Sequence, residues 1–260
     1  MHSITQIKDI PDFLPAVPHP KFEDAEHLAI LCHEIRTPLG AIVGLADLLA
    51  SLECSPEKQR ECADMLHDSS KMLMELLNDL LDSFKLGSGE MELEHIPFDL
   101  TKVLEEAKNI ITVKAQEKGL NVYINIGRDI PVLFMGDPLR IRQILLNLLS
   151  NAIKFTNKGI ISIHMNEEIT SNGYSHIRIT VADSGIGIGK ENLSKIFNKY
   201  KQASTSVSRE YGGTGLGLFI SQELAYLMKG RISVESWPLI GSHFTVSLPL
   251  QKASALLVAA

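Results

Sequence analysis

The sequence predicts an α+β protein in which a helical hairpin, forming a dimeric four-helix bundle, is followed by an α/β sandwich domain with a mixed sheet. Apolar residues recur at steps of three and four between about residues 22 and 84, which is typical of amphipathic helices. After about residue 99, strand-like and helix-like runs follow one another without strict alternation, which favours a mixed sheet covered by helices on one face. The length of 260 residues suits one small and one medium domain.

Proline and glycine divide the chain into segments. Residues 1–20 contain several prolines and no periodic pattern, so we expect a tail or a linker there. We expect the helical domain at 21–87, a linker at 88–98, the second domain at 99–250 and a tail at 251–260. The two periodic regions are thus expected to fold as separate units.

Two long helices are predicted in the helical domain. Ser55 and Pro56 suit the cap and the first position of the second helix, which should end at the glycines of residues 87–89. A single hairpin cannot bury both apolar stripes, so we expect a homodimer, with packing of the hairpin on the following domain as the alternative. The first helix runs from about 22 to 51, and its stripe consists of Leu28, Leu31, Ile35, Leu39, Ile42, Leu45 and Leu49.

In the second domain, capping residues and apolar patterns predict four helices and five strands. Asp99 is the expected cap of the first helix, and a further helix should begin near Asp137 and Pro138. The helices are expected at about 99–119, from 137, at 191–198 and at 215–229, and the strands at 121–126, 160–167, 176–183, 231–236 and 243–249.

Charge and composition exclude several kinds of partner. The net charge of −6 argues against nucleic acid and against an anionic membrane surface, because either would require a basic face. No window approaches the ~20 apolar residues that cross a bilayer, so we expect no membrane contact within this chain. We expect a cytoplasmic protein or the cytosolic part of a longer one. Cys32 is expected to be a small, buried apolar filler, with a redox role beside His33 as the alternative.

The segment NLLSNAIKF places Asn147 and Asn151 one turn apart on a predicted helix, with Lys154 near the same face. Two amide oxygens suit a hydrated Mg²⁺ ion, and the lysine suits a phosphate. A solvated polar face is the alternative. The three residues therefore indicate a candidate site for Mg²⁺ and phosphate.

Two glycine-rich segments follow. In VADSGIGIG, a carboxylate at the end of a strand, Asp183, can accept a hydrogen bond from the exocyclic amine of adenine, whereas guanine presents an acceptor there. In YGGTGLGLFIS, glycines precede and open a helix, whose N-terminus can bind phosphates. Turns in which the glycines serve only backbone geometry are the alternative. The polar segment before the second of these, with Lys199, Lys201 and Arg209, suits a lid.

The ordered set HEIRTPL, NLLSNAIKF, DSGIGI and GGTGLGL resembles the two-component sensor histidine kinases over about residues 22–250. The resemblance implies a dimerisation and phosphoacceptor hairpin followed by an ATP-binding domain of the Bergerat type. It implies that ATP and Mg²⁺ support phosphorylation of His33 and transfer to an aspartate of a response regulator receiver domain. Phosphatase activity toward that regulator is a further expectation.

The resemblance also implies roles for single residues. Asp183 would contact the adenine amine, Asn147 and Asn151 would hold Mg²⁺, and Lys154 would meet a phosphate. The segment after Phe197 departs from the family pattern, so no lid contact is carried over. The adenine side would be shaped by Gly185 and Gly187, and the phosphates framed by Gly213, Thr214, Gly215, Leu216 and Gly217.

His33 is expected on the exposed face of the first helix, because at ~100° per residue it lies opposite Leu31 and Ile35. Glu34 can accept a hydrogen bond from one ring nitrogen when the other nitrogen attacks a phosphoryl group. Thr37, one turn further on, can position a water, and its place matches the phosphatase residue of the family that the sequence resembles. Pro38 removes a backbone N–H and should bend the helix.

Two other functions fit parts of the pattern. The first is a non-catalytic dimeric scaffold or ATP-gated binding module that kept the fold, and the intact Asp183, Asn151 and glycine-rich segments argue against it. A Bergerat-type ATPase or serine kinase would not need HEIRT on a hairpin. The sequence therefore favours a protein-histidine kinase.

Overall fold

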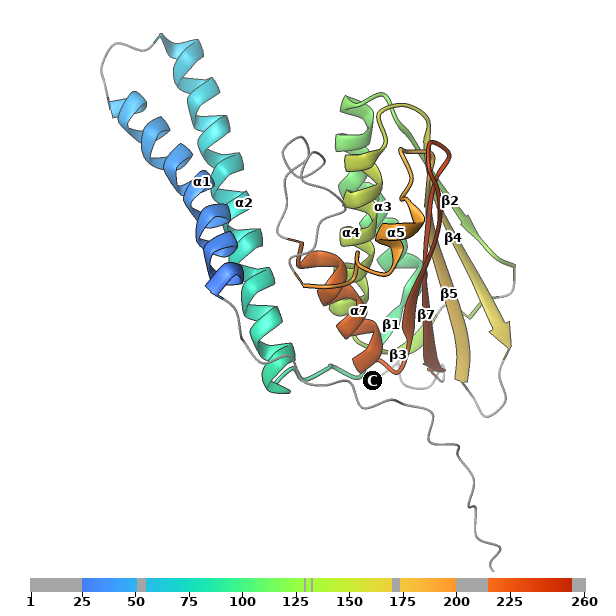
Figure 1. Cartoon of the computed structure of the whole chain (residues 1–260). Helices are drawn as coiled ribbons and strands as arrows, with labels where there is room; N and C mark the ends of the chain where they lie inside the picture. The colour runs from blue at the N-terminus through green and yellow to red at the C-terminus, as the bar shows by residue number, and fades with distance from the viewer. Residues whose placement is uncertain are drawn as a thin grey trace, which may run out of the picture.

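The computed structural model describes residues 25–50, 55–128, 130–131, 133–169, 174–199 and 215–253. A helical hairpin stands beside a domain in which helices cover one face of a mixed sheet (Figure 1). The predicted order of a hairpin and an α/β sandwich is confirmed. The expected tail at the N-terminus and the last residues of the chain lie outside the described residues.

The hairpin consists of α1 (Ala25–Ala50) and α2 (Pro56–Ser88). The Ser55 hydroxyl accepts the Lys58 N–H at 3.4 Å, so the predicted cap of α2 is confirmed. Gly89 ends α2 in the left-handed conformation, with φ of 73°, and its N–H donates to the Leu86 carbonyl. Both ends of α2 are thus defined by local sequence.

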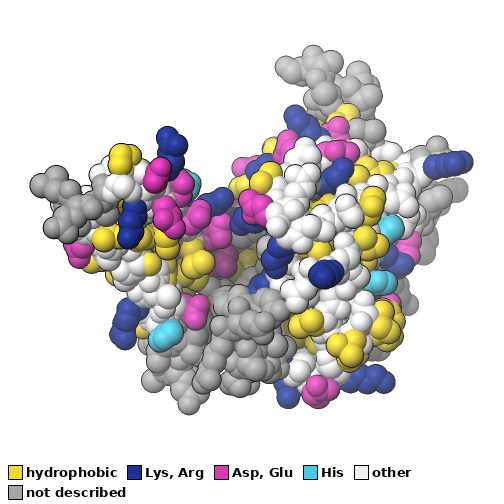
Figure 2. Space-filling view, turned by 90° about the horizontal axis from the view of Figure 1, so that it is seen from above, with side chains coloured by type: hydrophobic (Ala, Val, Ile, Leu, Met, Phe, Trp, Pro, Cys, Tyr) yellow, Lys and Arg dark blue, Asp and Glu magenta, His cyan; other side chains and the backbone are white. Residues whose placement is uncertain are grey.

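Large apolar side chains stay exposed on the hairpin. Val43 is 54 % exposed, Met65 52 % and Met72 57 %, although all three lie on long helices. Hydrophobic side chains are visible on the hairpin in the view from above, where charged side chains gather on the side toward the second domain (Figure 2). Packing on the second domain therefore leaves an apolar face of the hairpin uncovered.

In the described residues, seven strands form the sheet of the second domain, in the order β1-β3-β7-β5-β4-β2, with β6 beside β7. Among these described strands, only β2 and β4 pair in parallel. The five predicted strands are confirmed, whereas β1 and β3, each of four residues, were not predicted. The strands are β1 (Ile96–Asp99), β2 (Asn121–Ile126), β3 (Leu133–Gly136), β4 (Ile160–Ile169), β5 (Tyr174–Asp183), β6 (Arg231–Trp237) and β7 (Gly241–Lys252). Thus β1 begins inside the segment expected as a linker, and β7 extends into the expected tail.

Helices α3 (Leu100–Glu117), α4 (Pro138–Phe155) and α7 (Gly217–Leu227) cover one face of the sheet (Figure 1). Asp99 and Asp137 cap α3 and α4 as predicted. The helix predicted at 191–198 is only the short α5 (Lys190–Leu193), followed by turns. The core between α4 and the sheet includes Ile141, Leu145, Leu148 and Leu149 against Ile161, Ile163, Ile177 and Ile179.

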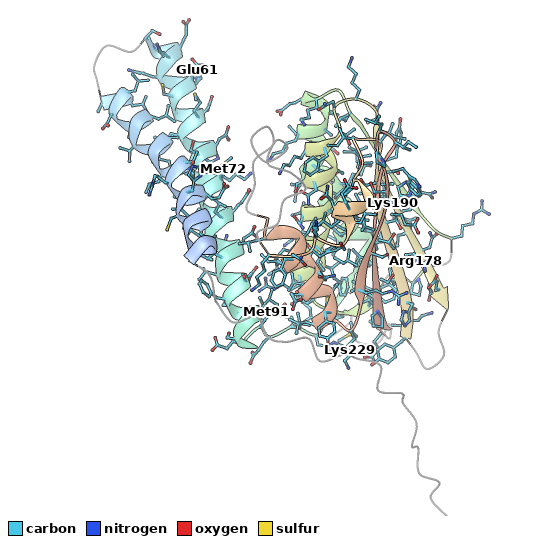
Figure 3. The ribbon with its side chains drawn as sticks, viewed as in Figure 1. Glu61, Met72, Met91, Arg178, Lys190 and Lys229 are labelled. Carbon is cyan, nitrogen blue, oxygen red and sulfur yellow. The ribbon has the colours of Figure 1, made fainter. Side chains whose placement is uncertain are left out.

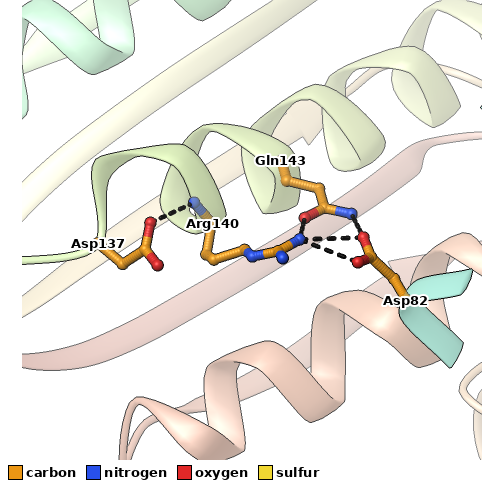
Figure 4. A network of polar contacts seen from close by, with 4 residues as sticks. All are labelled: Asp82, Asp137, Arg140 and Gln143. Carbon is orange, nitrogen blue, oxygen red and sulfur yellow. Dashed lines mark hydrogen bonds and ion pairs between the residues drawn. The ribbon is translucent and has the colours of Figure 1, made fainter. Parts of the chain in front are cut away.

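An ion pair joins the hairpin to the second domain. Arg140 of α4 donates from Nη1 to both carboxylate oxygens of Asp82 on α2, at 3.2 and 3.0 Å. The Gln143 amide completes the group: its Nε2 donates to Asp82 at 2.7 Å, and its Oε1 accepts from Arg140 at 2.8 Å (Figure 4). The ion-paired side chains are only 18 % and 14 % exposed. We call Asp82, Arg140 and Gln143 the interdomain clasp.

The chain between the domains is fixed at the same end of α4. Asp137 is 4 % exposed; one of its carboxylate oxygens accepts the Arg140 N–H, and the other accepts the Glu94 N–H at 3.1 Å. Met91 is buried where the chain passes from α2 into the second domain (Figure 3). The start of α4 therefore receives contacts from both the connecting chain and the hairpin.

Acidic groups on α2 make the clasp depend on its cation. Burial, together with the neighbouring carboxylates of Asp82 and Glu75, raises the pKa of Asp79 to about 6. Negative charge is thus costly on this face of α2. The Arg140 guanidinium offsets part of this cost through its ion pair with Asp82.

Arg140→Ala should destabilise the protein by about 1–3 kcal/mol, because it leaves the largely buried Asp82 carboxylate without its cation. The matched control is Arg142→Ala on the same helix, whose pair with Glu106 is 37 % and 41 % exposed, and which should cost less than about 1 kcal/mol. Urea unfolding measures both values. Equal losses in the two variants would show that the clasp adds nothing to the attachment of the domains.

Candidate functional site

Three segments far apart in the sequence meet around α4. The Ile186 N–H, in the loop after β5, donates to the Phe155 carbonyl at the end of α4, at 3.2 Å. Asn147 of α4 donates from Nδ2 to the Ser221 hydroxyl of α7 at 2.8 Å. The asparagine-bearing helix therefore touches both glycine-rich segments, so the described parts of the three segments lie together around α4.

Asn147 and Asn151 lie on one face of α4, as their spacing predicted. The Asn151 Nδ2 is 3.5 Å from the Asn147 Oδ1, so the two amides are neighbours with only a weak contact between them. Both residues are half-buried. Amide oxygens from two neighbouring residues on one helix face are ligands that suit a hard, hydrated cation.

Lys154 is half-buried at the end of the same helix. Burial lowers the pKa of its ammonium group, and the Glu34 carboxylate of α1 acts in the opposite direction. The side chain that was expected to meet a phosphate is therefore close enough to Glu34 to feel its charge. This end of α4 therefore lies on the side of the hairpin helix that carries His33.

Asp183 lies at the end of β5, opposite Ser242 of β7. Its Oδ1 accepts the Gly185 N–H at 2.8 Å. Burial raises the pKa of Asp183, while backbone hydrogen bonds from Gly185 and Ser242 and the charge of His243 lower it. A half-buried carboxylate held in this way can accept a hydrogen bond from an amine of a ligand.

The glycines of the Asp183 loop approach other backbone segments. A Cβ at Gly185 would lie 2.3 Å from the Phe155 carbonyl oxygen. Gly187 has φ of 67°, and a Cβ there would lie 2.1 Å from the Trp237 carbonyl oxygen. These glycines therefore allow the loop to pack closely against the end of α4 and the end of β6, next to Asp183.

The third segment begins α7 directly beside Asn147. Gly215 has φ of 66°, Leu216 is fully buried, and a Cβ at Gly217 would lie 2.3 Å from the Asn147 Oδ1. The first N–H groups of α7 have no acceptor within the helix, which makes this end suitable for an anion. Gly213, Thr214 and all of the expected lid segment (198–213) beyond Lys199 lie outside the described residues.

His33 is exposed on α1, as predicted. The Thr37 hydroxyl donates to the His33 carbonyl at 3.2 Å, so Thr37 lies one turn along the same face. The helix continues through Pro38, which is buried. Glu34 is half-buried beside the histidine, and the bend at Pro38 stays a prediction.

Sequence reasoning missed three residues that shape the site. Ser221 holds the amide of Asn147, Ser242 bonds Asp183, and Gly241 lets the chain pass close to the Asp183 carbonyl oxygen. Of the three, only Ser221 could have been predicted from the sequence, because it lies four residues after Gly217 and therefore on the same face of α7. Within the described ranges, no helix is sufficiently long and apolar to span a membrane.

Two family models match the chain. Residues 24–89 match the His Kinase A (phospho-acceptor) domain. Residues 136–252 match the model described as histidine kinase-, DNA gyrase B-, and HSP90-like ATPase. The first match covers the hairpin with His33, and the second covers the three segments around α4.

Curated relatives are similar to this chain in sequence. The chain is 42 % identical to the sensor protein GacS of Pseudomonas syringae pv. syringae, over 88 % of this chain and 25 % of the relative. It is 41 % identical to the signal transduction histidine-protein kinase BarA of Escherichia coli strain K12, over 85 % of this chain and 24 % of that protein. The chain thus spans about a quarter of the length of these relatives.

Solved structures show the same fold. The structure of full-length ShkA in complex with AMPPNP matches with a TM-score of 0.66 and 31 % identity, over 92 % of this chain and 48 % of that one. The histidine kinase ThkA in complex with the response regulator protein TrrA matches with a TM-score of 0.60 at 23 % identity, over 86 % of this chain and 61 % of that one.

Gly187→Ala should destabilise the protein by about 3 kcal/mol, because a Cβ would both strain a left-handed residue and collide with the Trp237 carbonyl. Gly119→Ala is the matched control: its φ is 69°, but no atom lies within 4 Å of the added Cβ, so only about 1 kcal/mol should be lost. Thermal unfolding compares the two. Similar losses would mean that the close approach at Gly187 does not constrain the loop.

Proposed function

The chain belongs to the sensor histidine kinases, and we propose that it transfers the γ-phosphoryl group of ATP to His33 and then to an aspartate of a response regulator. The observation that carries this proposal is the convergence of Asn147, Asp183 and the start of α7 around one helix, whose far end approaches Glu34 beside His33. The family match supports the reaction class.

Asp183 would read the adenine base. Its carboxylate, held by Gly185 and Ser242, would accept the exocyclic amine of adenine, and guanine would present an acceptor in the same place. A solved relative, ShkA, was crystallised with AMPPNP, an analogue of ATP. The start of α7 at Gly215 and Gly217 would meet the phosphates through its first backbone N–H groups.

The donor set of α4 fits Mg²⁺. Asn147 and Asn151 present amide oxygens on one face, and the absent side chain at Gly217 leaves room beside the Asn147 oxygen. When bound, Mg²⁺ would neutralise charge on the transferred phosphoryl group. Lys154 would contribute a further positive charge to the same end of the nucleotide.

The neutral imidazole of His33 would be the nucleophile. One ring nitrogen forms a bond to the γ-phosphorus as the bond from that phosphorus to the bridging oxygen of ADP breaks. The proton on the other ring nitrogen would be accepted by Glu34, the half-buried neighbour in the helix. In phosphatase activity, Thr37, on the same face, would orient a water that attacks the aspartyl phosphate of the regulator, so that the phosphorus–oxygen bond to the aspartate breaks and inorganic phosphate is released.

The hairpin would act as a homodimer and would dock the receiver domain of a response regulator. The exposed apolar side chains of α1 and α2, among them Val43, Met65 and Met72, are what a second hairpin would cover in a four-helix bundle. A phosphohistidine is a labile donor, so its phosphoryl group suits onward transfer to a carboxylate. We assign this transfer to the region of α1 around His33.

His33→Gln should abolish labelling from γ-³²P-ATP and Mg²⁺, because it removes the nucleophilic nitrogen. The label on the wild type should be acid-labile and base-stable. The matched control is His67→Gln, which changes an exposed histidine on α2 and should leave labelling unchanged.

Label that persists in the His33→Gln variant would move the acceptor to another residue. Wild-type protein that binds ATP in a direct assay but takes up no label would instead favour the non-catalytic, ATP-gated scaffold.

A further inference from the structure

We propose that Ser221 is a positioning residue that turns the Asn147 amide so that its carbonyl oxygen faces the metal. The inference rests on the proposed function, in which Asn147 binds Mg²⁺. It starts from one contact: the Asn147 Nδ2 donates to the Ser221 Oγ at 2.8 Å, across the interface between α4 and α7.

The two ends of an asparagine amide are not equivalent for a cation. The oxygen is a ligand, whereas the NH₂ group carries two hydrogens and repels a positive charge. The last torsion of asparagine is broad, so helix geometry alone does not choose between the two orientations. An acceptor on one side of the amide makes the choice, because it holds the NH₂ group and leaves the oxygen on the opposite side.

Helix α7 supplies this asymmetry with two residues one turn apart. Ser221 is 1 % exposed, so its hydroxyl is shielded from water where it accepts the Asn147 N–H. Gly217, four residues earlier, lies against the Asn147 Oδ1, where even a methyl group would come within 2.3 Å. One residue therefore binds the NH₂ end, and the other keeps the space at the oxygen end clear.

The other contacts of Asn147 do not fix its amide as firmly. Asn151 is 3.5 Å from the oxygen, beyond the usual range of a strong hydrogen bond. Ser150, on the same helix, donates to the Asn147 backbone carbonyl at 3.0 Å and does not bond the amide in the described contacts. Ser221 is thus the partner whose removal should release the orientation.

Ser221→Ala should weaken metal binding about tenfold, as is usual when the partner of a metal ligand is removed. The first measurement is titration of Mn²⁺, followed by its paramagnetic resonance signal, into protein saturated with AMPPNP. The second is AMPPNP binding in EDTA, which should stay unchanged because the adenine contacts do not involve Ser221. Ser150→Ala is the matched control and should leave both values as in the wild type.

Asn147→Asp distinguishes a role of Ser221 in orienting the amide from a role in packing alone. A carboxylate has two equivalent oxygens, so its orientation no longer matters to the cation. In the Asn147→Asp background, Ser221→Ala should therefore have little effect on Mn²⁺ affinity. This comparison holds even if Ser221→Ala lowers the melting temperature, since both backgrounds would share that loss.

Equal Mn²⁺ affinity in the wild type and Ser221→Ala would overturn the proposal, even if His33 were labelled normally. A tenfold loss in both the wild-type and the Asn147→Asp backgrounds would also overturn it, because it would indicate a packing role. A loss confined to the wild-type background would support it, even in protein whose His33 takes up no label. That combination of results would contradict the proposed kinase function and leave the proposed role of Ser221 intact.

Discussion

Helix α4 makes three contacts on which the rest of the arrangement depends. Arg140, in its first turn, binds Asp82 of the hairpin, Asn147 in its middle binds Ser221 of α7, and Phe155 at its end accepts the Ile186 N–H. Its 18 residues span about 27 Å. The buried face of α4 rests on the sheet, so one rigid element sets the distances among the hairpin, the Asn147 and Asn151 amides and the Asp183 loop.

This arrangement explains why the site contains so many glycines and so few charges. At Gly185 and Gly217 a side chain would collide with the carbonyl of Phe155 or the amide of Asn147, so close packing on α4 is possible only without one. Asp183 and Lys154 are both half-buried, and burial shifts each pKa toward the neutral form. A ligand that pairs with each group would therefore offset part of the free-energy cost of burying its charge.

Much of the fold could be predicted because local sequence determines it. Ser55, Asp99 and Asp137 each cap the helix that follows them, and the periodic stripes gave the long helices. The strands β1 and β3 were missed because four residues are too few to show alternation. Ser221 and Asp82 were missed because their partners lie 74 and 58 residues away, and only the packing of helices brings them together.

The central claim, that α4 and the Asp183 loop form an adenine-specific nucleotide site, is tested most directly by titrating ATP and GTP against the wild type and Asp183→Asn. We expect the wild type to bind ATP and to discriminate against GTP. We expect Asp183→Asn, although folded by its thermal transition, to lose ATP affinity by at least about tenfold, since a carboxylate acceptor for the amine is removed. Unchanged ATP affinity in folded Asp183→Asn would show that Asp183 does not bind the adenine amine.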